Sequence, residues 1–170
     1  MRRVVVGVSG TPGSLAALHR AAAEARAREA QLWVVMAWQA PGGELGSRNS
    51  CNVSALAQCR EAAAERLRRI LDLAFGARPA GVTPAGLTVR ATPGAALVDT
   101  ARGGDDLLVV GAGSRALLRR LARPSVARYC LAHAVCPVLT VPPPPLQAEL
   151  DAVHRRNLWH LPLDTRELAP

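Results

Sequence analysis

Apolar residues along the chain fall into two patterns that alternate with each other. Short apolar or β-branched runs, typical of buried strands, occupy residues 3–8, 32–38, 87–90, 106–110 and 138–141. Between these runs apolar residues recur every three or four positions, the spacing of one helix face, and predict helices near residues 15–25, 54–75, 94–101 and 125–134. Strands that alternate with helices and are apolar throughout form parallel sheets covered on both faces.

This pattern predicts one Rossmann-like α/β domain with a five-stranded parallel sheet in the strand order 3-2-1-4-5 and helices on both faces. A ligand of such a sheet binds at the carboxyl ends of the first and fourth strands, where the chain order reverses. The proline run at 142–145 has no amide hydrogens to donate to a sheet. We therefore expect the domain to occupy residues 1–142, and a C-terminal extension at 143–170 that packs on the domain or docks onto a protein partner.

Composition narrows the class of function. Hydrophobic residues make up 49% of the chain, but no uninterrupted run approaches the ~20 residues of a membrane-spanning helix. The apolar run after Arg3 is interrupted at Gly7, too soon for a secretion signal, so we expect a cytoplasmic protein with no membrane partner. All 21 basic residues are arginines and aromatics are only 3%, which argues against a nucleic-acid partner despite the net charge of +8.

The four cysteines show no Cys-x-x-Cys pair and no zinc-site spacing; they are Cys51, Cys59, Cys130 and Cys136. In a reducing cytoplasm we expect free thiols and no structural metal. His133 lies three residues before Cys136, and we favour packing near a helix end over a metal site.

A glycine turn follows the fourth predicted strand, in the segment Gly111-Ala112-Gly113-Ser114. The next helix opens at Pro124-Ser125-Val126, beyond an arginine-rich stretch at 115–123. Free backbone amides and the positive end of a helix dipole hold phosphate groups in such turns. The sequence therefore predicts an anion site here, although Pro124 has no N–H to offer.

These segments together resemble the universal stress protein family over about residues 3–142. The resemblance is carried by 4–12, 32–38, 94–98, 106–111 and, most specifically, the His-Ala-Val-Cys-Pro-Val-Leu ending at 133–139. It implies the fold predicted above, a role in stress response without catalysis, and a homodimer formed through the last strand, here 138–141.

The family contains members that bind ATP and members that bind no nucleotide. The binders carry a glycine, two residues, a second glycine, nine residues, then glycine and Ser/Thr. On this chain the four positions are Gly111, Ser114, Pro124 and Ser125, so the spacing is kept while two identities are lost.

Two further positions of the family pocket also fall on this chain. The acidic residue after the first strand is replaced by Ser9, and the residue that contacts adenine is Ala37. The resemblance thus implies a pocket for ATP or AMP lined by Val8, Ser9, Ala37, Val110, Gly111, Ser114, Ser125 and Val126.

The departures from the family motif predict a weakened pocket. A charge-assisted hydrogen bond lost at Pro124 costs roughly 1.5–3 kcal/mol, or about tenfold in affinity or more. Arginines at 115, 119, 120 and 123 could offset part of this loss by binding phosphate directly. The alternative interpretation is that Gly111 is only a turn and Ser125 only a helix cap.

We therefore expect a non-catalytic, stress-associated regulator with a weakened nucleotide pocket. The alternative is a functional ATP-binding member, or an ATP-using enzyme of the related adenine-nucleotide hydrolase group. The turn at 9–14 resembles the Ser-Gly-Gly-x-Asp-Ser loop of adenylating enzymes but lacks its acid, and Asp105 and Asp106 precede the fourth strand, at the wrong end for the site. We predict no catalytic residues. A third possibility is an interaction module built on the proline run and the segment around Trp159.

Overall fold

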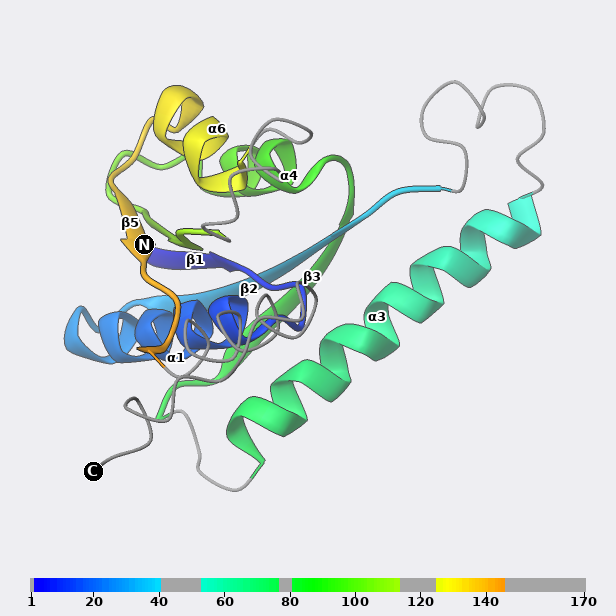
Figure 1. Ribbon diagram of the computed structural model, residues 1–170, viewed down its shortest axis with the longest axis horizontal. Helices are drawn as coiled ribbons and strands as arrows, with labels where there is room; N and C mark the ends of the chain where they lie inside the picture. Colours follow the sequence, from blue (N-terminus) through cyan, green and yellow to red (C-terminus); the bar gives the residue numbers. More distant parts are fainter. Residues whose placement is uncertain (1, 41–52, 77–80, 114–124, 146–170) are drawn as a thin grey trace, which may run out of the picture.

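The computed structural model of the chain describes residues 2–40, 53–76, 81–113 and 125–145 (Figure 1). Its elements follow in the order β1 (Arg3–Gly7), α1 (Pro12–Ala27), β2 (Gln31–Trp38), α3 (Val53–Phe75), β3 (Pro84–Arg90), α4 (Pro93–Thr100), β4 (Leu107–Gly111), α6 (Val126–His133) and β5 (Val138–Val141). The strands form one parallel sheet in the order β3-β2-β1-β4-β5, which confirms the predicted architecture.

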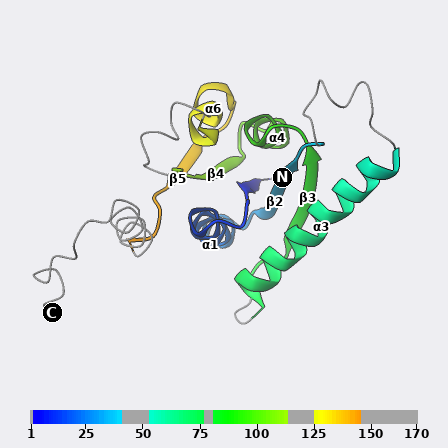
Figure 2. The ribbon, with the colours of Figure 1, turned by 45° about the vertical axis from the view of Figure 1, so that its right-hand side comes forward.

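Helices cover both faces of the sheet, as Figure 2 shows from near its edge. Because side chains alternate along a strand, Val4 and Val6 of β1 pack on the face covered by α1 and α3, while Val5 packs on the face of α4 and α6. All three valines are completely buried. The central strands are therefore apolar at every position, as the predicted two-sided burial requires.

Strand β3 begins at Pro84, three residues before the predicted start at 87. Its register places Pro84 beside Leu32, Ala85 beside Trp33 and Gly86 beside Val34. A Pro-Ala-Gly segment has little intrinsic strand preference, so the sequence pattern did not predict a strand over these three residues. An edge strand tolerates proline as its first residue, and β2 supplies the hydrogen-bonding partner.

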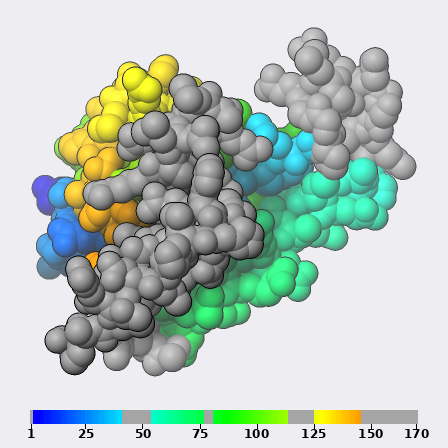
Figure 3. All heavy atoms as spheres, in the orientation of Figure 1, coloured from blue at the N-terminus to red at the C-terminus, as the bar shows by residue number. Residues whose placement is uncertain are grey.

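The sheet has β5 at its other edge. In Figure 3, α6 (yellow) and β5 (orange) lie next to each other at one margin of the molecule, with α3 (teal to green) along the opposite margin. Beyond β5 the structure describes residues 142–145, and the predicted extension from 146 onward lies outside the described residues. No helix within the described segments combines the length and apolarity needed to cross a membrane.

Two buried cysteines pack between α6 and the sheet. Cys130 is fully buried, and burial together with the neighbouring Cys136 raises its pKa to about 11. Burial also raises the pKa of Cys136. Both are free thiols, as is Cys59, whereas Cys51 lies outside the described residues. His133 is exposed, its Nδ1 donates to the carbonyl of Tyr129 at 2.9 Å, and its ring stacks on that of Tyr129 with the centroids 4.2 Å apart.

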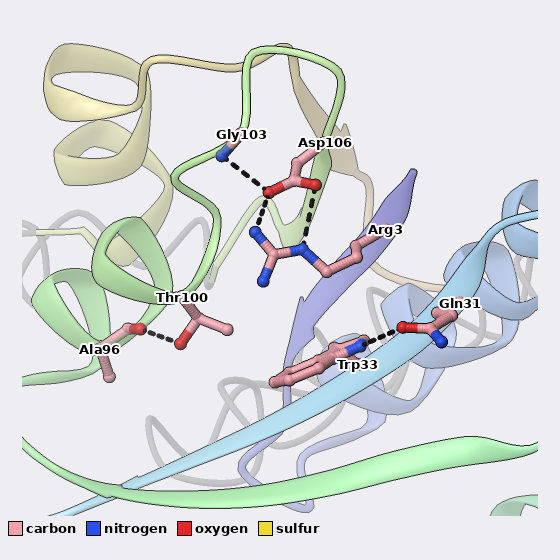
Figure 4. Close-up of polar contacts among 7 residues, drawn as sticks. All are labelled: Arg3, Gln31, Trp33, Ala96, Thr100, Gly103 and Asp106. Atoms are coloured by element: carbon pink, nitrogen blue, oxygen red, sulfur yellow. Dashed lines mark hydrogen bonds and ion pairs between the residues drawn. The ribbon is translucent and has the colours of Figure 1, made fainter. Parts of the chain in front are cut away.

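An ion pair joins the amino ends of the two central strands (Figure 4). Arg3 donates from Nε to Oδ1 of Asp106 at 3.1 Å and from Nη2 to Oδ2 at 2.6 Å. The amide of Gly103 donates to Oδ2 at 2.9 Å, and the guanidinium of Arg3 lies 5.4 Å from the ring centroid of Trp33. Burial opposes ionisation of Asp106, but these hydrogen bonds outweigh it and hold the pKa of Asp106 below its ordinary value.

The pair predicts a specific loss of stability in the variant Asp106→Asn. The variant leaves Arg3 without its partner, so we expect the free energy of unfolding to fall by about 3 kcal/mol at neutral pH in urea denaturation. The matched control Asp105→Asn removes the same charge from an exposed neighbour and should change stability by less than about 0.5 kcal/mol.

The same variant has an expected pH dependence. Because the folded-state pKa of Asp106 is lowered, its contribution is complete above about pH 4 and is lost as the pH falls through the folded value. The difference in the free energy of unfolding between the parent and Asp106→Asn should therefore become smaller as the pH falls. A constant difference down to the acid transition would contradict this role for the ionised carboxylate.

Candidate functional site

The loop between β1 and α1 is held together by its own hydroxyl groups. The amide of Ser9 donates to Oγ of Ser14 at 3.3 Å, and that hydroxyl donates to the carbonyl of Thr11 at 2.8 Å. The amide of Ser14 donates to the Thr11 hydroxyl at 3.3 Å, so Thr11 caps α1, with Pro12 in its first turn. Gly10 adopts a φ of 78°, which a side chain would disfavour.

Strand β4 ends against this loop. A Cβ placed on Gly111 would lie 3.1 Å from the carbonyl oxygen of Gly13 and 3.9 Å from the amide nitrogen of Ser14. The end of β4 and the first turn of α1 therefore pack closely, which favours glycine at position 111 whether or not a ligand binds. The predicted meeting of the first and fourth strands is present in the structure.

Ser125 occupies the N-cap position of α6 but does not cap the helix with its side chain. Its φ and ψ are −64° and 128°, its carbonyl accepts from Tyr129 at 3.0 Å, and its hydroxyl makes no capping hydrogen bond. A Cβ placed on Gly113 would lie 3.9 Å from Oγ of Ser125, so the turn after β4 and the start of α6 are close together. The side chain of Ser125 is exposed.

The apolar residues of the predicted pocket lie on both sides of the sheet. Val8 is buried with the cluster under α1, and its amide donates to the carbonyl of Val35 at 3.0 Å. Val110 is buried in the other cluster, against which Ala37 and Val126 pack. Ser114, Pro124 and the arginines at 115–123 lie outside the described residues.

Arg66 of α3 reaches this site and was not identified from the sequence. Its Nη2 donates to the carbonyl of Ser9 at 2.7 Å, across 57 positions of the chain. Ile70, one turn further along α3, contacts the same loop, since a Cβ on Gly10 would lie 3.4 Å from its Cδ1. The only hint in the sequence is the absence of an acidic residue three or four positions from Arg66.

The acidic residues Asp105 and Asp106 lie at the opposite edge of the sheet, as predicted. Asp106 precedes β4 and is engaged by Arg3 at the start of β1. The described segments at the carboxyl edge, 8–14, 110–113 and 125–126, contain no acidic residue. Their chemistry is limited to hydroxyls, backbone amides and the neighbouring guanidinium, a set suited to binding an anion.

Comparison with known proteins identifies the family of the chain. The model of the universal stress protein family matches residues 1–142. The chain belongs to the universal stress protein family. The resemblance found in the sequence is thereby confirmed. No curated protein sequence matches the chain.

Solved structures of other universal stress proteins share the fold. One, solved in complex with cAMP, is 29% identical with a TM-score of 0.61, and the match covers 84% of this chain and 98% of that one. A family member from Burkholderia pseudomallei is 26% identical with a TM-score of 0.53, over 84% and 96% of the two chains. A universal stress protein from Archaeoglobus fulgidus in complex with dAMP, 23% identical with a TM-score of 0.55 over 82% and 97%, shows the fold alone.

The contact between β4 and α1 predicts different effects for two glycine substitutions. Gly111→Ala pushes a methyl group against the backbone of Gly13, and we expect it to lower the free energy of unfolding by about 1–3 kcal/mol. Gly13→Ala meets nothing within 4 Å and lies in a helix, so it should be neutral or stabilise by up to about 1 kcal/mol. Chemical denaturation of both variants measures this, and equal stabilities would contradict the close approach.

Proposed function

We propose that this universal stress protein is a cytoplasmic, non-catalytic regulator of stress response that binds an adenine nucleotide, ATP or AMP, in a weakened pocket. The observation that carries the proposal is the meeting of three segments at one edge of the sheet: the Ser9 loop, the turn after Gly111 and the start of α6 at Ser125. The complex of a 29% identical universal stress protein with cAMP supports a nucleotide as the ligand.

The reduced affinity follows from where the backbone donors are directed. The amides of Ser9 and Ser14 already donate to hydroxyl groups within the loop, so a phosphate would have to displace these hydrogen bonds. Pro124 has no amide hydrogen at all. Within the described residues the hydroxyl of Ser125 makes no capping hydrogen bond, so it is a polar group that a phosphate could engage.

We propose that the protein is not an enzyme because of where its acidic side chains lie. Asp106 is committed to Arg3 at the amino edge of the sheet, away from the proposed pocket. The segments that form the carboxyl edge in the described structure offer hydroxyls but no carboxylate that could act as a general base. The alternative, a functional ATP-using enzyme, would require such a group from elsewhere in the chain.

The proposed function predicts that Pro124→Gly tightens nucleotide binding. The exchange restores an N–H donor, and in calorimetric titrations of the full chain with ATP and with cAMP we expect affinity to rise about tenfold. Pro144→Gly, the same exchange in the proline run after β5, should leave affinity unchanged.

Two results would count against the proposal. Equally tight binding by parent and Pro124→Gly would show that the pocket is not weakened at this position. Steady turnover of ATP by the purified parent, with or without magnesium, would show that the protein is an enzyme.

We further propose that the protein forms a homodimer through the outer edge of β5, which pairs with no other strand in the described part of the chain. The carbonyls of Pro137 and Val141 accept from Leu108 and Ala112, so the main-chain groups of Thr140, which lies one residue before Val141, point toward the open edge. Leu131 and Val135 near this edge are 62% and 69% exposed, which provides apolar surface for a second copy.

The dimer predicts different behaviour for two variants at one position. Thr140→Pro removes an N–H from the open edge without breaking the pairing with β4, and should give a folded monomer in sedimentation experiments. Thr140→Val keeps the N–H and should remain dimeric. A monomeric parent would contradict the proposed interface.

A further inference from the structure

The guanidinium of Arg66 lies beside the proposed nucleotide site, and within the described structure its one hydrogen-bond acceptor is a neutral backbone carbonyl. Arg66 donates from Nη2 to Ser9 O at 2.7 Å, and the side chain is exposed. A guanidinium carries five N–H donors, so most of them remain for another acceptor. The Ser9 contact holds the group in place before any ligand arrives.

No acidic side chain of α3 is placed to neutralise this charge. The positions three and four residues from Arg66 are Ala62, Ala63, Arg69 and Ile70. The other arginines of this stretch of α3 differ, because Arg68 and Arg69 each have an acidic residue three or four positions away. The described loop segments at the site add no carboxylate either.

A continuous set of contacts connects Arg66 to the turn after β4. Arg66 binds the carbonyl of Ser9, the amide of Ser9 binds the hydroxyl of Ser14, and the amide of Ser14 lies 3.9 Å from a Cβ placed on Gly111. The guanidinium is therefore part of the same edge as the predicted anion turn. The amides of Ser9 and Ser14 already donate within the loop, so the N–H groups of Arg66 that are not used by Ser9 are donors that need not give up an existing hydrogen bond.

We propose that Arg66 sets the charge preference of the site by donating to phosphate oxygens, so that the pocket favours highly charged adenine nucleotides such as ATP over cAMP and adenosine. This inference rests on the proposed function, because it concerns the same ligand and the same edge of the sheet. Hydrogen bonds between a guanidinium and phosphate are charge-assisted and stronger than those between neutral groups. Arg66 is held at the site by Ser9, which reduces the ordering cost on binding.

The test is a calorimetric titration of the full chain with three ligands that share the nucleoside: neutral adenosine, singly charged cAMP and ATP. In Arg66→Met we expect affinity for ATP to fall about tenfold or more, affinity for cAMP to fall less, and affinity for adenosine to stay unchanged. Arg66→Lys keeps the charge and should retain part of the preference for ATP. Raised salt should weaken ATP binding to the parent more than to Arg66→Met.

The matched control is Arg68→Met. It removes the same charge from the same helix, but Arg68 lies on a different face, with Arg60, Glu61 and Glu65. We expect its affinities for the three ligands to equal those of the parent. Thermal unfolding of each variant checks that the exposed substitutions leave the fold intact.

The outcomes separate the inference from the proposed function. Equal losses for all three ligands in Arg66→Met would mean that Arg66 only positions the Ser9 loop, and would overturn the inference while leaving nucleotide binding intact. Unchanged ATP affinity, or an equal loss in Arg68→Met, would also overturn it. A parent chain that binds none of the three ligands would overturn the proposed function and the inference together.

Discussion

The neighbouring strands β1 and β4 are covered on both faces, and this burial decides where polar side chains can lie. Val4, Val5 and Val6 of β1 are completely buried, and the β4 run from Leu107 to Val110 is at most 4% exposed. An unpaired polar group along either strand would be costly, so charged and hydroxyl side chains are confined to the strand ends. The polar groups at the amino ends of these two strands consequently differ from those at the carboxyl ends.

At the amino edge the charges are matched. Arg3 and Asp106 form a bidentate ion pair, and the amide of Gly103 donates a further hydrogen bond to the same carboxylate. A charge that is paired in this way is a structural group and leaves little capacity for a ligand. At the carboxyl edge the described loops contain no carboxylate, and Arg66 is held by a neutral carbonyl. The asymmetry gives one edge a structural role and the other the properties of an anion site.

Gly111 illustrates how one residue can satisfy packing and binding at once. A Cβ at this position would lie 3.1 Å from the carbonyl oxygen of Gly13, so packing by itself favours glycine here and the residue alone says little about a ligand. Ser125 is more informative, because it stands at the N-cap position and yet its hydroxyl does not cap α6. A helix cap would have been the simpler explanation of that serine. The proposed pocket therefore depends more on Ser125 than on the glycine motif, and its proposed weakness depends on the amides of the Ser9 loop that already donate to hydroxyl groups.

The sequence alone determined the order of elements, the parallel sheet and its switch point, because burial on two faces leaves a periodic apolar pattern that can be counted along the chain. It also located the Ser9 and Gly111 segments, whose turn residues are local signals. Two features were decided only by tertiary structure. The first residues of β3 became a strand because β2 offered them a partner, and Arg66 joined the site because α3 packs its Ala63, Leu67 and Ile70 face inward. A contact between residues 57 positions apart produces no periodic pattern in the sequence. It depends on how α3 packs against the rest of the domain, and not on the residues that neighbour Arg66 in the chain.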